Sequence, residues 1–144
     1  MSYATVPFKR WHLAWLHEDG AAEGGMGAYV SQEDLPYLER MNSYTFICDD
    51  KPILCGGTMR QWRNRHMGWA YMNKHSSQHM LAITRAAIAH LDAVVGRIDF
   101  TVRRDFAAGH RWARLLGFVV ENPPGILTAY GPEQEDHIAY WRFN

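Results

Sequence analysis

The spacing of apolar residues changes abruptly at Gly96, and this change constrains the fold more than any other feature of the sequence. Apolar residues recur at helical spacing from Met80 to Val94, which predicts a helix over 78–95 that ends at the glycine. Residues 97–103 then alternate strictly between polar and apolar types, as in a half-buried strand. A long helix that leads directly into a strand is typical of domains that pack helices against a sheet.

A second helix is predicted between Asp105 and Gly117. Asp105, like Ser76 and Ser77 before the first helix, is a residue type that caps helix N-termini, and glycine commonly ends a helix. The side chains expected to be buried on the two helices are Met80, Leu81, Ile83, Ala87, Ile88, Leu91, Val94, Val95, Ala108, Trp112, Leu115 and Leu116.

Short β-rich segments surround these helices. Strands are predicted at 44–48, 53–59, 69–72, 118–121 and 137–143. The pair Gly56–Gly57 inside one of them indicates a bulge or a close backbone neighbour. In the N-terminal third, Ser31 begins a short helix, residues 18–27 predict a mobile glycine-rich loop, and residues 8–16 fit either a strand or a helix.

This order of elements predicts an α+β (mixed α/β) fold with about six or seven strands in one sheet. The chain has 144 residues, of which 47% are apolar, so we expect residues 1–144 to form a single domain. Fifteen basic side chains balance fifteen acidic ones, which argues against a protein that binds nucleic acid through its phosphates. The sequence has no apolar run long enough to cross a membrane and no signal-peptide pattern, so we expect a cytoplasmic protein.

The cysteines and histidines predict no metal site. Cys48 and Cys55 flank a predicted turn, and we interpret them as reduced, partly buried thiols. His75 and His79 are four residues apart and could share one helical face, but no carboxylate or cysteine accompanies them as in zinc enzymes. A solvated helix start is the favoured interpretation of this pair.

The segment VRRDFAAGHRWARLLGFVVE, residues 102–121, resembles the end of a GNAT acyltransferase domain. It contains a strand end, a short helix, Leu116-Gly117-Phe118 and the start of another strand. The preceding hairpin, long helix and strand follow the order of the same family, so the resemblance covers residues 43–143. His110-Arg111-Trp112 ahead of this triplet is similar to phage-encoded GNAT relatives, a group of acetyltransferases and internal virion proteins.

The resemblance implies that acetyl-CoA is a cosubstrate bound between two splayed parallel strands, 69–72 and 98–102. The backbone of Ala70, Tyr71 and Met72 would then bind the acyl arm, and the turn 73–78 would bind the phosphates at the start of the long helix. The side chains implied for the phosphates are Lys74, Ser76, Ser77 and Gln78. This turn lacks the glycines of the family, and simple helix capping is the alternative role of its serines.

Many GNAT enzymes protonate the leaving thiolate with a tyrosine, but the matching residue here is Ala113. His110 lies one helical turn earlier and is one candidate for this role; the alternative is an exposed or packing residue. Tyr71 is a second candidate.

Two functional hypotheses therefore remain. The first is an acetyl-CoA-dependent N-acetyltransferase that acts on a small-molecule or protein amine, with a homodimer as one candidate assembly. The second is a catalytically inactive GNAT-fold protein that serves a phage as a structural or interaction module, with a virion protein as its partner and the host cytoplasm or the virion as its location.

Overall fold

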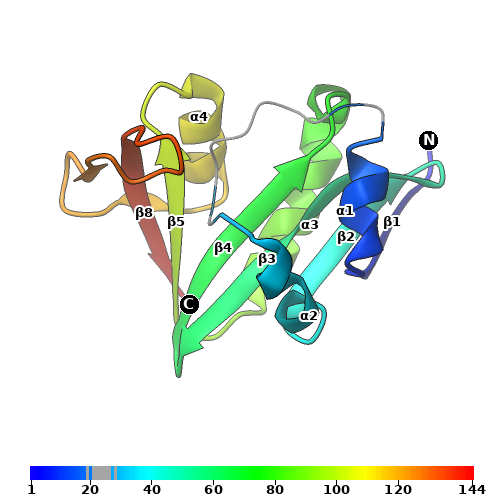
Figure 1. Ribbon diagram of the computed structural model, residues 1–144, viewed down its shortest axis with the longest axis horizontal. Helices are drawn as coiled ribbons and strands as arrows, with labels where there is room; N and C mark the ends of the chain where they lie inside the picture. Colours follow the sequence, from blue (N-terminus) through cyan, green and yellow to red (C-terminus); the bar gives the residue numbers. More distant parts are fainter. Residues whose placement is uncertain (19, 21–26, 28) are drawn as a thin grey trace.

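The computed structural model describes residues 1–18, 20, 27 and 29–144, and these residues form an eight-stranded sheet with helices on both faces (Figure 1). The strand order is β1-β2-β3-β4-β5-β8-β6, and β7 also pairs with β8. β4 and β5 are parallel, whereas the other pairings are antiparallel. The predicted mixed sheet with flanking helices is confirmed, and two of its strands, β1 and the short β7, were not predicted.

The elements have the following bounds within the described residues. The strands are β1 (Tyr3–Pro7), β2 (Asn42–Cys48), β3 (Lys51–Trp62), β4 (Arg65–Met72), β5 (Arg97–Arg103), β6 (Val119–Val120), β7 (Ile126–Leu127) and β8 (His137–Phe143). The helices are α1 (Trp11–Leu16), the 3-10 turn η1 (Gln32–Asp34), α2 (Leu35–Leu38), the 3-10 turn η2 (Ser76–His79), α3 (Met80–Asp92) and α4 (Ala107–Leu115).

Each face of the sheet carries its own apolar cluster, because successive side chains of a strand point to opposite faces. α3 and α4 cover one face, where Ile98, Phe100 and Val102 of β5 are buried. α1 and α2 lie over the other face, where Trp69 and Cys55 are buried. Figure 1 shows α1 and α2 in front of the sheet and α3 behind it. We refer to these as the α3 face and the α1 face.

The α3 helix is shorter than predicted at both ends. Ser76 and Ser77 belong to the preceding 3-10 turn and make no side-chain cap, and the helix ends at Asp92 rather than at Val95. The Asn144 side-chain amide donates to the carbonyls of Leu91 and Val94, both at 2.6 Å, so the C-terminus of the chain satisfies the end of this helix. The predicted burial of Leu81 and Val95 is wrong, because both lie on the exposed side.

The α4 helix confirms the predicted burial of Trp112 and Leu116. The predicted burial of Ala108 and Leu115 is wrong, because both side chains are exposed. Asp105 does not cap it: the N-cap position is Phe106, and the Asp105 carboxylate instead accepts from Arg103 Nε at 2.7 Å. Trp112 Nε1 donates to Thr84 Oγ1 at 3.0 Å, which joins α4 to α3.

The N-terminal predictions are resolved where the structure describes them. Residues 11–16 are helical, and Ser31 and Asp34 form the reciprocal contacts of a capping box. The loop predicted at 18–27 lies largely outside the described residues.

Cys48 and Cys55 are buried thiols in the clusters of opposite faces, so they do not pair with each other. Every helix in the described ranges is too short or too polar to span a membrane.

A buried histidine holds α1 against the sheet. Lys9 N–H donates to His12 Nδ1 at 3.1 Å, and Thr45 Oγ1 lies 2.7 Å from the same nitrogen. Because Nδ1 accepts the Lys9 hydrogen, the imidazole is neutral in this arrangement. Burial, followed by the charge of Lys9, lowers the pKa of His12 below its ordinary value of 6.5.

Replacing Trp112 with alanine should reduce the free energy of unfolding by about 3–5 kcal/mol, because a buried indole leaves a cavity. Arg114→Ala, on the exposed side of the same helix, should cost far less. Urea unfolding of both variants measures the difference. Equal losses would show that the buried side of α4 is assigned incorrectly.

The protein should lose stability as the pH falls below 6.5. The unfolded His12 takes up a proton near that pH, whereas the folded His12 does so only at lower pH, so protonation favours unfolding between the two values. His90, whose pKa is also lowered by burial, adds to the effect. Urea unfolding at about pH 7 and about pH 5 should show a smaller loss in His12→Gln than in the wild type. The matched control His75→Gln, at an exposed histidine, should keep the full loss of stability between the two pH values. An equal loss in both variants would contradict the assignment to His12.

Candidate functional site

The parallel strands β4 and β5 pair over a short stretch and then diverge. Their register pairs are Arg65 with Arg97, His66 with Ile98 and Met67 with Asp99. Figure 1 shows the strands separating from this common end toward their C-termini. We call the diverging segments, Gly68–Met72 of β4 and Phe100–Arg103 of β5, the fork. Residues 69–72 and 98–102 were predicted to be parallel neighbours. The first segment lies in the fork, and the second begins in the paired stretch and continues into the fork.

Charged side chains hold the strands together where they pair. The Asp99 carboxylate accepts from Arg65 Nε of β4 at 2.7 Å and from Arg97 Nε of β5 at 2.8 Å. Arg97 also contacts Glu121 at 2.8 Å, and these carboxylates raise its pKa, Asp99 most strongly. Asp99 is nearly buried, so its two cationic partners satisfy a carboxylate that would otherwise be costly to bury.

Gly27 lies between the two strands at the base of the fork. It forms an isolated antiparallel bridge with Trp69, and its N–H donates to the Thr101 carbonyl at 2.6 Å. The Thr101 hydroxyl is 3.3 Å from the Gly27 carbonyl. Gly27 has a φ of +73°, and a Cβ there would lie 2.8 Å from the Trp69 Cα. Only glycine fits this approach without strain.

The β4 side of the fork contains the three residues predicted to bind an acyl arm. The side chains of Ala70 and Met72 pack toward the α3 face, whereas Tyr71 packs on the α1 face. The Tyr71 hydroxyl accepts the Val30 N–H at 3.1 Å, which leaves its own hydrogen available for donation. Burial raises the pKa of Tyr71, so the hydroxyl stays protonated near neutral pH.

The turn 73–78 connects the fork to α3, but many of its backbone donors have partners. The N–H of Lys74 donates to Gly20, that of Ser76 to Asn73 and that of Gln78 to His75. The N–H of His75 donates to the Asn73 side chain at 2.9 Å. Ser76 is buried, while Lys74, Ser77 and Gln78 are exposed and available to a ligand.

His110 does not point into the fork. Its Nδ1 is 2.7 Å from the Tyr140 hydroxyl on β8, and its Nε2 is 3.0 Å from the Arg104 carbonyl. Since a carbonyl only accepts, Nε2 carries the hydrogen and Nδ1 accepts from Tyr140. Burial raises the pKa of Tyr140, which favours its role as donor. The two predicted catalytic residues, His110 and Tyr71, therefore lie on opposite faces of the sheet.

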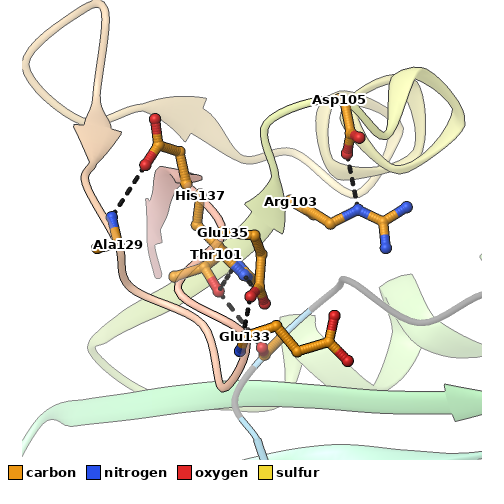
Figure 2. Close-up of polar contacts among 9 residues, drawn as sticks. Thr101, Arg103, Asp105, Ala129, Glu133, Glu135 and His137 are labelled. Carbon is orange, nitrogen blue, oxygen red and sulfur yellow. Dashed lines mark hydrogen bonds and ion pairs between the residues drawn. The ribbon is translucent and has the colours of Figure 1, made fainter.

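Sequence reasoning missed a polar cluster on the α1 face of β5 and β8 (Figure 2). Thr101 contacts His137, and His137 contacts Glu135. A sequence signal existed: Thr101 and His137 are polar residues in predicted strands. Their proximity depends on the pairing of β5 with β8, which local patterns do not specify. In the described part of the chain, no three His, Cys, Asp or Glu side chains gather to hold a metal ion.

Comparisons with solved structures identify this arrangement of elements. Ard1 from Thermoplasma volcanium has a TM-score of 0.72 and 13% identity, covering 99% of this chain and 97% of its own. The ribosomal-protein-S18-alanine N-acetyltransferase from Escherichia coli has a TM-score of 0.68 and 16% identity, covering 97% and 92%. A Bacillus subtilis acetyltransferase in complex with CoA has a TM-score of 0.67 and 10% identity, covering 99% and 97%.

The chain has the GNAT fold. Structures described as GNAT-family acetyltransferases, such as one from Streptococcus pneumoniae with a TM-score of 0.65, 13% identity and coverage of 99% of this chain and 100% of its own, share the same arrangement. No known family profile and no curated protein matches the sequence. The likeness to these structures is therefore one of fold.

Asp99→Asn should lower the free energy of unfolding by about 1–3 kcal/mol, because two arginines lose their charged acceptor. Asp105→Asn, which removes an exposed carboxylate from Arg103, is the matched control and should leave the unfolding transition nearly unchanged. Urea unfolding measures both. A control variant as unstable as Asp99→Asn would contradict the role of Asp99 in joining the strands.

Proposed function

We propose that this protein is an acyl-CoA-dependent N-acyltransferase, with acetyl-CoA as donor and an amine as acceptor. The observation that carries this proposal is the divergence of β4 and β5 directly before the turn that begins α3. Diverging strands leave backbone groups without a neighbouring strand, and a helix start favours phosphate. Among the structural neighbours, one acetyltransferase is a complex with CoA.

The donor would lie along β4. The backbone of Ala70, Tyr71 and Met72 would hydrogen-bond its acyl arm, as one strand bonds another. Its phosphates would lie at the turn, where Lys74 supplies a positive charge and Ser77 and Gln78 are exposed donors. Ser76, also predicted as a ligand, is buried and would contribute by supporting the turn.

The reaction needs a donor for the thiolate that leaves CoA. We assign this role to Tyr71, since its hydroxyl hydrogen is available and its raised pKa keeps it protonated. The second predicted donor, His110, contacts Tyr140 and Arg104 through its two ring nitrogens, and we propose that it fixes α4 on β8 instead.

The acceptor would be a primary amine. The names of two structural neighbours include such acceptors: the alanine of ribosomal protein S18, and spermidine in a Vibrio cholerae SpeG chimera. The chimera has a TM-score of 0.66 and 13% identity, covering 99% of this chain and 96% of its own. A small-molecule amine and a protein amine are therefore the acceptor classes to test.

Calorimetry with acetyl-CoA tests the donor site. The wild type should bind, and Ser77→Glu should weaken binding by about tenfold or more, because an added carboxylate repels the phosphates. Ser77→Gln, of similar size without the charge, is the matched control and should retain more affinity. Circular dichroism checks that both variants fold.

No heat of binding to the wild type at millimolar acetyl-CoA would overturn the proposed function and favour a non-catalytic interaction module. Full affinity of Ser77→Glu would show that the phosphates bind elsewhere.

A further inference from the structure

We propose that Thr101, His137 and Glu135 form a proton relay that carries a proton from the amine acceptor in the fork to the protein surface. This inference rests on the function proposed above and assigns the residues that would activate the acceptor. The acceptor class it implies is an alkylammonium ion, because only a protonated amine needs to lose a proton before it attacks.

The three side chains form a continuous chain of contacts (Figure 2). Thr101 Oγ1 is 3.3 Å from His137 Nδ1, and His137 Nε2 is 3.2 Å from Glu135 Oε1. Thr101 belongs to β5 in the fork, His137 begins β8, and Glu135 lies in the loop between β7 and β8. Contacts of this length are common in enzymes without bound substrate and shorten in the reactive complex.

Burial decreases along this chain. Thr101 and His137 are only 3% and 5% exposed, whereas the Glu135 side chain is 27% exposed. Because Thr101 is almost completely buried, a proton released there has little direct access to bulk water. The contacts from Thr101 through His137 to Glu135 supply a route to the surface.

The geometry accommodates both protonation states of His137. With a neutral ring, Nε2–H donates to the Glu135 carboxylate and Nδ1 accepts the Thr101 hydrogen. With a charged ring, Nδ1–H donates to Thr101, whose hydroxyl then donates to the Gly27 carbonyl at 3.3 Å. The Thr101 hydroxyl therefore has an acceptor in either state, as a relay requires.

The carboxylate of Glu135 is held in place from two sides. Glu133 N–H donates to Oε2 at 2.9 Å, while Oε1 faces His137. The carboxylate lies against Gly131, where a Cβ would overlap it. Its own backbone N–H and His137 lower the pKa of Glu135, so it is ionised near neutral pH and stabilises a charged imidazole.

The other charges around His137 have partners of their own. Arg103, which is opposite His137 in the strand register, contacts Asp105. Asp136 accepts from Ala129 N–H and pairs with Arg104. The Tyr130 ring lies 5.3 Å from the His137 ring, and Glu133 enters the site through its backbone. Among the residues that the structure describes, Glu135 is the carboxylate in contact with the imidazole.

The chemical step balances as follows. The ammonium gives one proton to Thr101 Oγ1 as the Thr101 hydrogen moves to His137 Nδ1. His137 then passes its Nε2 proton to Glu135, and Glu135 releases that proton to water. The amine nitrogen forms a bond to the thioester carbonyl carbon, and the carbon–sulfur bond breaks. The thiolate takes a proton from Tyr71, which regains one from the attacking nitrogen.

Kinetics of thiol release from acetyl-CoA, with trialanine amide and propylamine as primary-amine probes, test the relay. His137→Gln and Thr101→Val should lower kcat by about a hundredfold while calorimetry shows unchanged acetyl-CoA affinity. Glu135→Gln should move the acid limb of the kcat/KM profile to lower pH, because a neutral amide no longer stabilises the charged imidazole. The matched control Glu133→Gln removes a charge from the same loop and should leave the profile unchanged.

Gly131→Ala is a second probe that keeps every charge. The added methyl displaces the flexible end of Glu135 from His137, so the acid limb should move as in Glu135→Gln, with little change in the unfolding transition.

The outcomes separate the two proposals. A wild type that does not bind acetyl-CoA overturns the N-acyltransferase function, and the relay with it. A wild type that binds acetyl-CoA but acetylates neither probe overturns the alkylammonium acceptor. Turnover that is insensitive to His137→Gln and Thr101→Val, or an acid limb unmoved in both Glu135→Gln and Gly131→Ala, overturns the relay alone.

Discussion

The contact of Asp99 with Arg65 and Arg97 is the interaction on which the rest of the site depends. It joins β4 to β5 at the end where they pair, and the strands diverge immediately beyond it. A sheet that paired along the full length of both strands would satisfy its backbone internally and leave nothing for a ligand to bind. A sheet in which β4 and β5 did not pair would lose the connection between the strands β1–β4 and the strands β5, β8 and β6.

In the proposed function, the two strands of the fork have different roles. On β4, the fork leads into the turn 73–78 and the start of α3, where an anionic ligand is favoured. On β5, the fork leads to Thr101 and, through His137, to Glu135 at the surface. A donor on the β4 side and an acceptor on the β5 side would meet near Gly27, which contacts both strands.

Much of the fold could be predicted from the sequence because its signals are local. The alternation in residues 97–103 predicted β5, and the helical spacing after Met80 predicted α3. The errors fall where tertiary contacts decide the outcome. Leu115 fits the apolar face of α4 but lies exposed. The end of α3 is satisfied by Asn144, whose two acceptors lie 50 and 53 residues earlier in the sequence.

The candidate site was less predictable, because it combines segments that are distant in the chain. The sequence indicated Tyr71 and the turn 73–78 through a family resemblance; Tyr71 lies in the fork, and the turn follows it directly. It also indicated His110, whose partners on β8 and in the β5–α4 turn direct it elsewhere. The contact of Thr101 with His137 depends on the pairing of β5 with β8, and no local pattern specifies that register.

Amide chemical-shift mapping during an acetyl-CoA titration tests whether the fork binds an acyl-CoA along β4. We expect the largest shift changes at Ala70, Tyr71 and Met72 and in the turn 73–78, and we expect them to saturate together. Changes confined to other parts of the sheet, or no changes at millimolar acetyl-CoA, would contradict this mode of binding.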